Sequence, residues 1–344
     1  MRFGHSAGAT LGALGALVAF VVLTVTACSG GGRPTRTPAP VSSRAPLHGR
    51  HLLTQNFLHT ERRVLYPGRA SGVGPAPAGL SLLVDVDGAV APSVFGAETL
   101  AELSEAPAAD TIAALFRERP VVFAVTVYLN FRDADAILAG SLDSALLARA
   151  SDLRALARGG DATVYLALGH TVNSPIWEDD PADVRRVYGY VGRLLRQYAP
   201  ASTKLTWYVA AGAPSYGGRS LRDYLPDGDL VDAVGMAVTR FDALGYGSNG
   251  FFDRSAVPEA VAIARELGAE VLVVDSAADG IVLARNPPPD TLWATWYEPF
   301  FALVDTVPEL TYFAHRGRWL TDSLTGARFR ERLGRSAPTD SGGS

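Results

Sequence analysis

Seven short apolar runs recur along this chain, and longer amphipathic segments separate them. Each run is continuously apolar rather than alternating with polar residues, which is typical of strands buried on both faces of a parallel sheet. Strands that alternate with helices in this way build βαβ units, so the pattern predicts an α/β fold. The predicted strands are Leu80–Val86, Val121–Leu129, Thr163–Gly169, Leu205–Ala211, Val231–Val238, Val271–Asp275 and Leu310–Ala314.

Signals for helices lie between these runs. One apolar face repeats at three- and four-residue spacing and predicts a helix that packs on the sheet. Its members are Leu146, Leu147, Ala150, Leu153 and Leu156. Asp180 followed by Pro181 predicts a helix start, because an acidic N-cap is followed by proline at the first helical position. Ala260–Leu267 has helical spacing and ends at Gly268, a residue type that commonly terminates helices.

The stretch Thr291–Val304 leaves two readings open. Its aromatic and aliphatic residues have helical spacing, but Pro299 would break the interior of a helix. A strand over Leu292–Tyr297, followed by a helix from Pro299, would supply an eighth strand. We expect a (β/α)8 TIM barrel, with an open doubly wound sheet as the alternative. No GxGxxG motif follows an early strand, which counts against a dinucleotide-binding sheet.

The amino-terminal segment has the features of an export signal. Leu11–Val25 is uncharged and apolar, and the sequence VTAC that ends at Cys28 resembles the bacterial lipobox, whose cysteine becomes lipidated and N-terminal. Cys28 is the only cysteine, so neither an internal disulfide nor a thiolate zinc site is expected. We expect residues 1–27 to be a lipoprotein signal peptide, with the rest lipid-anchored to the extracytoplasmic face of the cell membrane. An uncleaved membrane anchor is the alternative.

Composition divides the remainder of the chain. Residues 28–47 are rich in Gly, Pro, Ser and Thr and predict a flexible tether, and residues 336–344 predict a disordered tail. Residues 48–335 are left for one barrel domain, although the pattern assigns no element to 48–79. The formal net charge of −4 gives no argument for nucleic acid as a partner. We expect no cofactor and no metal, and a monomer.

Polar and aromatic residues gather where the predicted strands end, which is the end at which TIM barrels carry their sites. They are Asp85, Asp87, Tyr128, Asn130, His170, Thr171, Asn173, Tyr208, Arg240, Asp275, Ser276 and His315, with Trp177 and Trp319 just beyond. Aromatic rings stack on sugar faces, and carboxylates and amides bind hydroxyl groups, so this assortment predicts a glycan site. Asp87-Gly88 is also typical of a turn, the alternative to a metal or sugar role for Asp85 and Asp87.

The segment Val164–Trp177 resembles the strand-4 motif of family-26 glycoside hydrolases, the family of endo-β-mannanases. Three further segments resemble that family's motifs in the same order: Ile137–Asp143 before this strand, Val231–Gly235 on strand 6 and Val271–Ser276 on strand 7. The resemblance covers roughly residues 120 to 320. It implies a (β/α)8 barrel, a glycan as partner, and two catalytic glutamates at strand ends.

Three positions depart from the family's pattern. The acid/base glutamate falls on Thr171, the nucleophile on Asp275 and the strand-4 arginine on Ala167. A retaining mechanism needs two carboxyl groups about 5–5.5 Å apart, one protonated and one ionised. The hydroxyl of Thr171 is too weakly acidic to act as a general acid near neutral pH. Asp275 is one methylene shorter than glutamate, and a displacement of about 1 Å can lower a rate about a hundredfold.

The candidate site residues follow from these motifs and strand ends. The expected glycan-binding residues are His170, Asn173, Trp177, Tyr128 and Tyr208. Asp275 is expected to be catalytic only in an active enzyme, and Thr171 marks the degenerate acid/base position. The acidic run from Glu178 through Asp179 to Asp180 offers a carboxyl group that could replace the missing acid. The same run is typical of a solvated loop in which Asp180 caps the next helix.

Three functions stay open. The favoured one is a surface lipoprotein whose barrel binds a glycan, such as an envelope polysaccharide, and lacks ordinary hydrolysis. The second is an active glycoside hydrolase in which Asp275 works with a relocated carboxylic acid. An inverting enzyme tolerates carboxyl separations of about 6.5–9.5 Å, which makes this arrangement chemically feasible. The third is a structural or scaffolding lipoprotein in which the barrel is only a platform.

Overall fold

The computed structural model divides into two compact units, Met1–Ala45 and Pro46–Ser344, and the described residues all belong to the second. The described residues are 51–55, 79–94, 97–105, 108–109, 112, 122–157, 162–169, 171–174, 179–211, 218–239, 256–277, 288–314, 327–329 and 331–332. The side chains of 51–55, 91–94, 239, 275 and 277 fall outside the description. Within this part of the chain, no helix is long and apolar enough to span a membrane.

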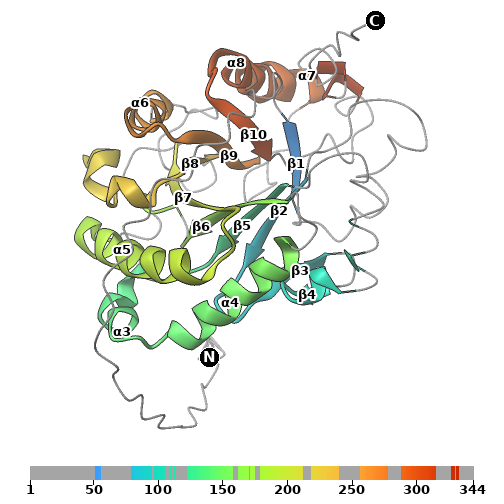
Figure 1. Cartoon of the computed structure of the whole chain (residues 1–344). Helices are drawn as coiled ribbons and strands as arrows, with labels where there is room; N and C mark the ends of the chain where they lie inside the picture. Colours follow the sequence, from blue (N-terminus) through green and yellow to red (C-terminus); the bar gives the residue numbers. More distant parts are fainter. Residues whose placement is uncertain are drawn as a thin grey trace, which may run out of the picture. The chain divides into compact units, whose positions relative to one another are not determined.

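Eight of the described strands are parallel and follow one another round a closed ring (Figure 1). In ring order they are β1 (His51–Gln55), β2 (Gly79–Val84), β5 (Val122–Val127), β6 (Thr163–Leu168), β7 (Thr203–Ala210), β8 (Ala233–Thr239), β9 (Glu270–Ala277) and β10 (Leu310–Ala314). β1 closes the ring because it pairs with β10 on one side and with β2 on the other. The closed ring confirms the predicted (β/α)8 barrel and excludes the open doubly wound sheet.

The eighth strand is β1, in the stretch to which the sequence pattern assigned no element. The alternative strand over Leu292–Tyr297 is wrong. That stretch is helical throughout, as α7 (Pro289–Leu292), a π-helical segment η9 (Trp293–Tyr297) and α8 (Glu298–Thr306). Pro299 is the second residue of α8, directly after the π-helical segment, so the helix changes its hydrogen-bonding pattern where proline lacks an N–H.

Helices lie outside the ring, as Figure 1 shows for α4, α5, α6 and α8. They are α3 (Ala134–Leu138), α4 (Asp143–Leu156), α5 (Pro181–Tyr198) and α6 (Val257–Leu267), with the short 3-10 turns η3 (Phe131–Asp133), η6 (Leu221–Tyr224) and η7 (Gly228–Leu230) between strands. The carboxylate of Asp180 accepts from the N–H of Ala182 at 2.7 Å, which confirms the predicted N-cap of α5. Gly268 ends α6 with a φ of 64°, as predicted. In α4, Leu147 is 38% exposed and does not belong to the predicted buried face.

An antiparallel hairpin of β3 (Ala89–Val94) and β4 (Ala97–Thr99) follows β2, before the 3-10 turn η2 (Glu102–Ser104). The turn at Asp87 and Gly88 is confirmed, and Gly88 adopts a φ of 95° that favours glycine. The carboxylate of Asp85 accepts from the N–H of Ala89 at 2.9 Å. Asp85 therefore helps to form this turn. Among the described residues, no group of three His, Cys, Asp or Glu side chains could hold a metal ion.

Two apolar cores lie on opposite sides of the strand ring. The larger one fills the space between the ring and the helices. The smaller one lies inside the ring and combines alanines with three tyrosines: Val122, Ala124, Tyr165, Ala167, Tyr208, Ala233, Ala237, Leu272, Val274, Tyr312 and Ala314. Gly235 keeps this interior free of overlap, because a Cβ there would lie 2.7 Å from Val274 Cγ2 and 2.8 Å from Thr206 Cγ2. We call this smaller set the inner core.

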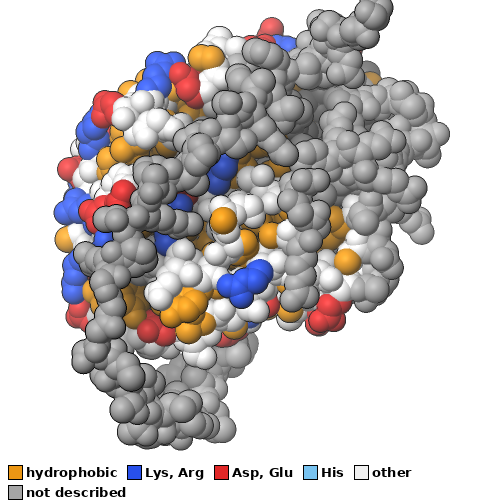
Figure 2. Space-filling model, in the orientation of Figure 1, with side chains coloured by type: hydrophobic (Ala, Val, Ile, Leu, Met, Phe, Trp, Pro, Cys, Tyr) orange, Lys and Arg blue, Asp and Glu red, His pale blue; other side chains and the backbone are white. Residues whose placement is uncertain are grey.

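Charged side chains of both signs share the outer surface. On the face drawn in Figure 2, Lys and Arg side chains lie interspersed with Asp and Glu side chains along the edge that α5 and α6 occupy. Ion pairs connect neighbouring segments there, such as Arg193 with Asp227 at 3.1 Å and Arg196 with Asp232 at 2.8 Å. Exposed pairs of this kind contribute little to stability, so the two apolar cores dominate the folding free energy.

Replacing Gly235 by alanine is expected to lower the free energy of unfolding by about 1–3 kcal/mol, because the added methyl group overpacks the inner core. Gly192→Ala in α5 is the matched control. A Cβ there would lie 3.5 Å from Leu205 Cδ1, an ordinary contact. That change is expected to be neutral or to stabilise the helix by up to about 1 kcal/mol. Denaturant unfolding of both variants checks this, and equal stabilities would contradict it.

Candidate functional site

The order of the strands in the ring places the motif residues. β6 is the fourth strand and β9 the seventh, counted from β1. The motif Val164–Trp177 therefore begins on strand 4, and Asp275 lies on strand 7, as the resemblance implied. Because all the strands are parallel, their carboxyl ends share one end of the barrel. That end is the candidate site.

The loop after β6 is fixed to the end of β7. The N–H of Val172 donates to the carbonyl of Tyr208 at 3.1 Å. The side chain of Asn173 is fully buried, donates to the carbonyl of Ala210 at 3.0 Å and accepts from the N–H of the same residue at 2.7 Å. These bonds give Asn173 a positioning role in the loop, and a direct contact between Asn173 and a glycan stays a prediction.

Thr171 lies at the corner of this loop and is partly exposed. Its carbonyl accepts from the N–H of Ser174 at 3.1 Å, which closes a tight turn. Gly169 precedes the corner with a φ of 78°, and a Cβ on it would overlap the ring of Phe131. The corner is thus well defined and presents a hydroxyl group rather than a carboxyl group. The predicted ligand residues His170 and Trp177 lie outside the described residues.

The two predicted site tyrosines differ in their surroundings. Tyr208 is 8% exposed and belongs to the inner core, where its ring packs beside Gly235. Tyr128 follows β5, is partly buried, and donates its backbone N–H to the carbonyl of Val84 at 2.8 Å. Burial raises the pKa of the Tyr128 hydroxyl, and the carboxylate of Asp179 raises that pKa further. Tyr128 therefore lies within electrostatic range of an acidic residue near the site.

Asp179 is that acidic residue. Its acidic run is typical of a solvated loop, but Asp179 itself is buried. It is only 2% exposed, directly before the N-cap Asp180 of α5. Burial raises the pKa of the Asp179 carboxyl to about 6, although the positive charge of Arg132 opposes the shift. A carboxyl group with such a pKa keeps its proton in mildly acidic solution. Glu178, its neighbour in the run, lies outside the described residues.

A β-bulge interrupts β9 just before Asp275. The register with β8 steps from Met236 opposite Val273 to Ala237 opposite Asp275, so β9 carries one extra residue, Val274. Ala237 belongs to the inner core, and residues paired across neighbouring strands share a face of the sheet. The bulge therefore places Asp275 at an inner-face register position, which the regular alternation of β9 would have assigned to the outer face. The Asp275 side chain itself is outside the described part.

Two buried serine hydroxyls bond to backbone carbonyls near this bulge. Ser81 Oγ, on β2, donates to the carbonyl of Val274 at 3.1 Å. Ser276 Oγ, on β9 itself, donates to the carbonyl of Ala314 in β10 at 2.6 Å. Ser276 is fully buried and Ser81 is 6% exposed. Ser276 was among the strand-end residues of the sequence, but Ser81 was not, because it lies inside an apolar run.

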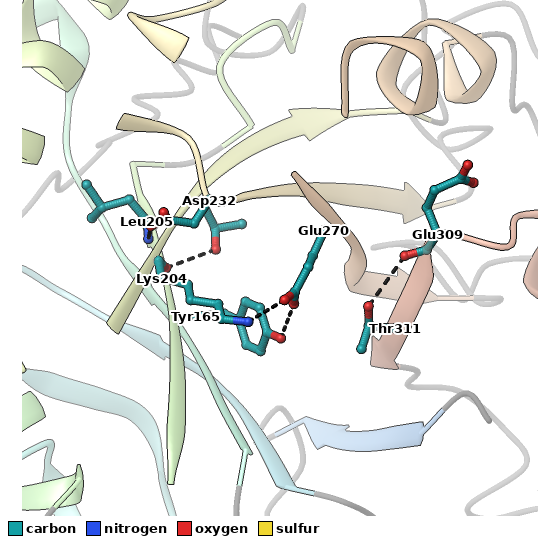
Figure 3. Close-up of polar contacts among 8 residues, drawn as sticks. Tyr165, Lys204, Leu205, Asp232, Glu270, Glu309 and Thr311 are labelled. Carbon is teal, nitrogen blue, oxygen red and sulfur yellow. Dashed lines mark hydrogen bonds and ion pairs between the residues drawn. The ribbon is translucent and has the colours of Figure 1, made fainter. Parts of the chain in front are cut away.

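A polar cluster that the sequence did not predict occupies the opposite, amino end of the barrel (Figure 3). Glu270 accepts from both the hydroxyl of Tyr165 and the ammonium group of Lys204, the only lysine in the chain. The Lys204 ammonium lies 5.1 Å from the centre of the Tyr165 ring, and the Tyr165 and Tyr312 ring centres are 5.7 Å apart. Residues at the amino end of such barrels serve stability, so we assign this cluster to folding.

Comparison with known proteins identifies the fold through solved structures. No protein-family model matches the chain, and no curated protein matches it by sequence. The catalytic domain of a GH26 endo-β-1,4-mannanase from Bacillus sp. JAMB-750 matches with a TM-score of 0.52 and 15% identity, over 78% of this chain and 76% of that chain.

Two further GH26 structures match to the same extent. A β-mannanase from Bacteroides ovatus matches with a TM-score of 0.51 and 12% identity, over 78% of this chain and 81% of that chain. GH26C from Muricauda sp. MAR_2010_75 matches with a TM-score of 0.52 and 11% identity, over 78% and 79% of the two chains. At these identities the comparisons show the barrel fold alone.

Asp179→Asn is expected to remove a pH dependence of stability. The folded chain holds the Asp179 proton up to about pH 6, whereas an unfolded aspartate loses it near pH 4. Between these values the folded state binds more protons, so stability falls as pH rises through this window. The melting temperature of the variant, relative to the wild type, should therefore be higher at pH 7.5 than at pH 4. A difference that is the same at both pH values would contradict this.

Proposed function

We propose that this chain is a surface lipoprotein whose barrel binds a glycan at the carboxyl ends of its strands and lacks ordinary retaining hydrolysis. The observation that carries the proposal is the corner after β6. The loop is fixed to β7 by Val172 and Asn173, and the residue at the corner is Thr171. A threonine hydroxyl can donate and accept hydrogen bonds with sugar hydroxyls, but it cannot protonate a leaving group near neutral pH.

The barrel and its aromatic residues support a glycan as the ligand. The matching structures include proteins named as β-mannanases, and they share the barrel fold with this chain. Tyr208 presents an aromatic ring within the inner core, and Tyr128 lies at the end of β5. In the proposal, His170 and Trp177 complete the site, the indole ring stacking on a sugar face. Asp275, at its inner-face register position, accepts hydrogen bonds from sugar hydroxyls.

The test is binding and turnover of a panel of β-mannan, β-glucan and envelope-derived oligosaccharides by the full-length chain in detergent. We expect saturable binding without cleavage products, and binding at least tenfold weaker for Trp177→Ala. Tyr198→Ala removes an aromatic ring that is 40% exposed at the end of α5, and it serves as the matched control with unchanged affinity. Cleavage that Asp275→Ala abolishes would overturn the proposal. Absence of both binding and cleavage would favour the scaffolding function instead.

A second candidate function rests on Asp179. In an active hydrolase with a relocated acid, Asp179 would donate the proton and Asp275 would act as the base of an inverting reaction. The specific observation in its favour is that Asp179 is buried and its pKa is raised to about 6, as a general acid requires. If the panel reveals turnover, Asp179→Asn should remove the alkaline limb of its pH–rate profile. An unchanged limb would exclude Asp179 as the acid.

Membrane anchoring through Cys28 is part of the proposal. We expect the full-length chain, expressed in a bacterium fed labelled palmitate, to incorporate label and to begin at residue 28 by mass. Cys28→Ser should lose the label, because serine offers no thiol for the lipid. Ser29→Ala is the matched neighbour and should keep it. A wild-type protein that retains residues 1–27 and carries no label would instead support the uncleaved anchor.

A further inference from the structure

We infer that Ser81 is a positioning residue for the glycan site: its hydroxyl holds the β9 bulge that brings Asp275 to the inner face of the barrel. The inference rests on the proposed function, in which Asp275 contacts the glycan. Ser81 lies on β2, far from Asp275 in the sequence, and no motif of the chain includes it. Its link to the site is the hydrogen bond to the carbonyl of Val274, the residue directly before Asp275.

The bulged residue Val274 accepts a hydrogen bond on the inner side of the ring. Met236 pairs with Val273 and the next residue, Ala237, pairs with Asp275, so Val274 is an extra residue in β9 with no partner position in β8. Its side chain belongs to the inner core, and its Cγ2 packs against Gly235. A hydrogen-bond donor stabilises a buried carbonyl group, because burial removes the group from water. Ser81 supplies such a donor at 3.1 Å.

Ser81 reaches the bulge across the interior of the barrel. In the ring, β1 and β10 lie between β2 and β9, so the bond from Ser81 to Val274 joins strands that are not neighbours. Ser81 pairs with Ala124 of β5, an inner-core residue, which places Ser81 on the inner face as well. A hydroxyl group in an apolar run has a specific acceptor here, the carbonyl of Val274.

The hydrogen bond from Ser81 to Val274 determines which residues at the carboxyl end of β9 lie at inner-face positions. Without the extra residue, the alternation of β9 would turn Asp275 to the outer face, where the core between ring and helices is apolar. A carboxylate on that side would be desolvated without a charged partner, which is strongly unfavourable. Loss of the Ser81 hydroxyl removes one of the bonds that hold the bulge. Removal of the Ser81 hydroxyl should therefore weaken ligand binding indirectly, by displacing Asp275, because Ser81 itself does not contact the ligand.

A double-mutant cycle tests this with β-1,4-mannohexaose, or whichever oligosaccharide of the panel binds, as the probe. We expect Ser81→Ala to weaken binding about tenfold in the wild-type background and hardly at all in the Asp275→Ala background. Ser81→Thr keeps the hydroxyl and should restore most of the affinity. Ser104→Ala is the matched control, because Ser104 Oγ also donates to a backbone carbonyl, that of Ala101 at 2.7 Å, in η2. It should leave the affinity unchanged.

A ligand-independent measurement separates failure of this inference from failure of the proposed function. Amide hydrogen exchange of the full-length chain should accelerate at residues 274–277 in Ser81→Ala and stay unchanged there in Ser104→Ala. If no glycan binds but exchange accelerates in this way, the proposed function fails and the role of Ser81 in holding the bulge stands. Unchanged exchange at 274–277, or equal losses of affinity in both backgrounds of the cycle, would overturn the inference.

Discussion

The pairing of β1 with both β10 and β2 is the contact on which the rest of the barrel depends. Without it, two strands would present open edges whose backbone groups would need other partners. With it, eight parallel strands end together at one mouth. Thr171 after β6 and Asp275 on β9, which are far apart in the sequence, lie at this same end of the barrel. The closing strand is short, and it also brings β2 within reach of β9, so that Ser81 can bond to Val274.

The interior of the ring combines small side chains, mainly alanine, with three large tyrosine side chains. Small residues line the wall, three tyrosines fill the lumen, and Gly235 leaves space for the bulged Val274. Polar groups interrupt this packing at two levels. At the amino end, Glu270 is satisfied by Tyr165 and Lys204, and towards the carboxyl end a serine hydroxyl satisfies the carbonyl of the bulge. In our proposal the two ends use polar contacts for different purposes: folding at the amino end and the position of Asp275 at the carboxyl end.

The sequence predicted seven of the eight ring strands because each is a continuous apolar run. It missed β1, whose sequence HLLTQ has only two apolar residues and so does not stand out as an apolar run. The helical identity of Trp293–Tyr297 was ambiguous because Pro299 suggested a break, whereas the helix continues past it through a π-helical segment. At the site, local motifs placed Thr171 directly after the fourth ring strand and Asp275 on the seventh, where the structure has them. The burial of Asp179 and the bond from Ser81 to Val274 depend on contacts between distant segments, which spacing along the chain cannot reveal.

The direction of β1 also determines the end of the barrel at which the ring begins. Parallel strands all start at the same end, so His51 lies at the amino end of the barrel, as does Glu270 of β9. The carboxyl-end mouth lies at the far end of every strand from His51. The start of the first strand and the mouth are thus separated by the full length of the barrel.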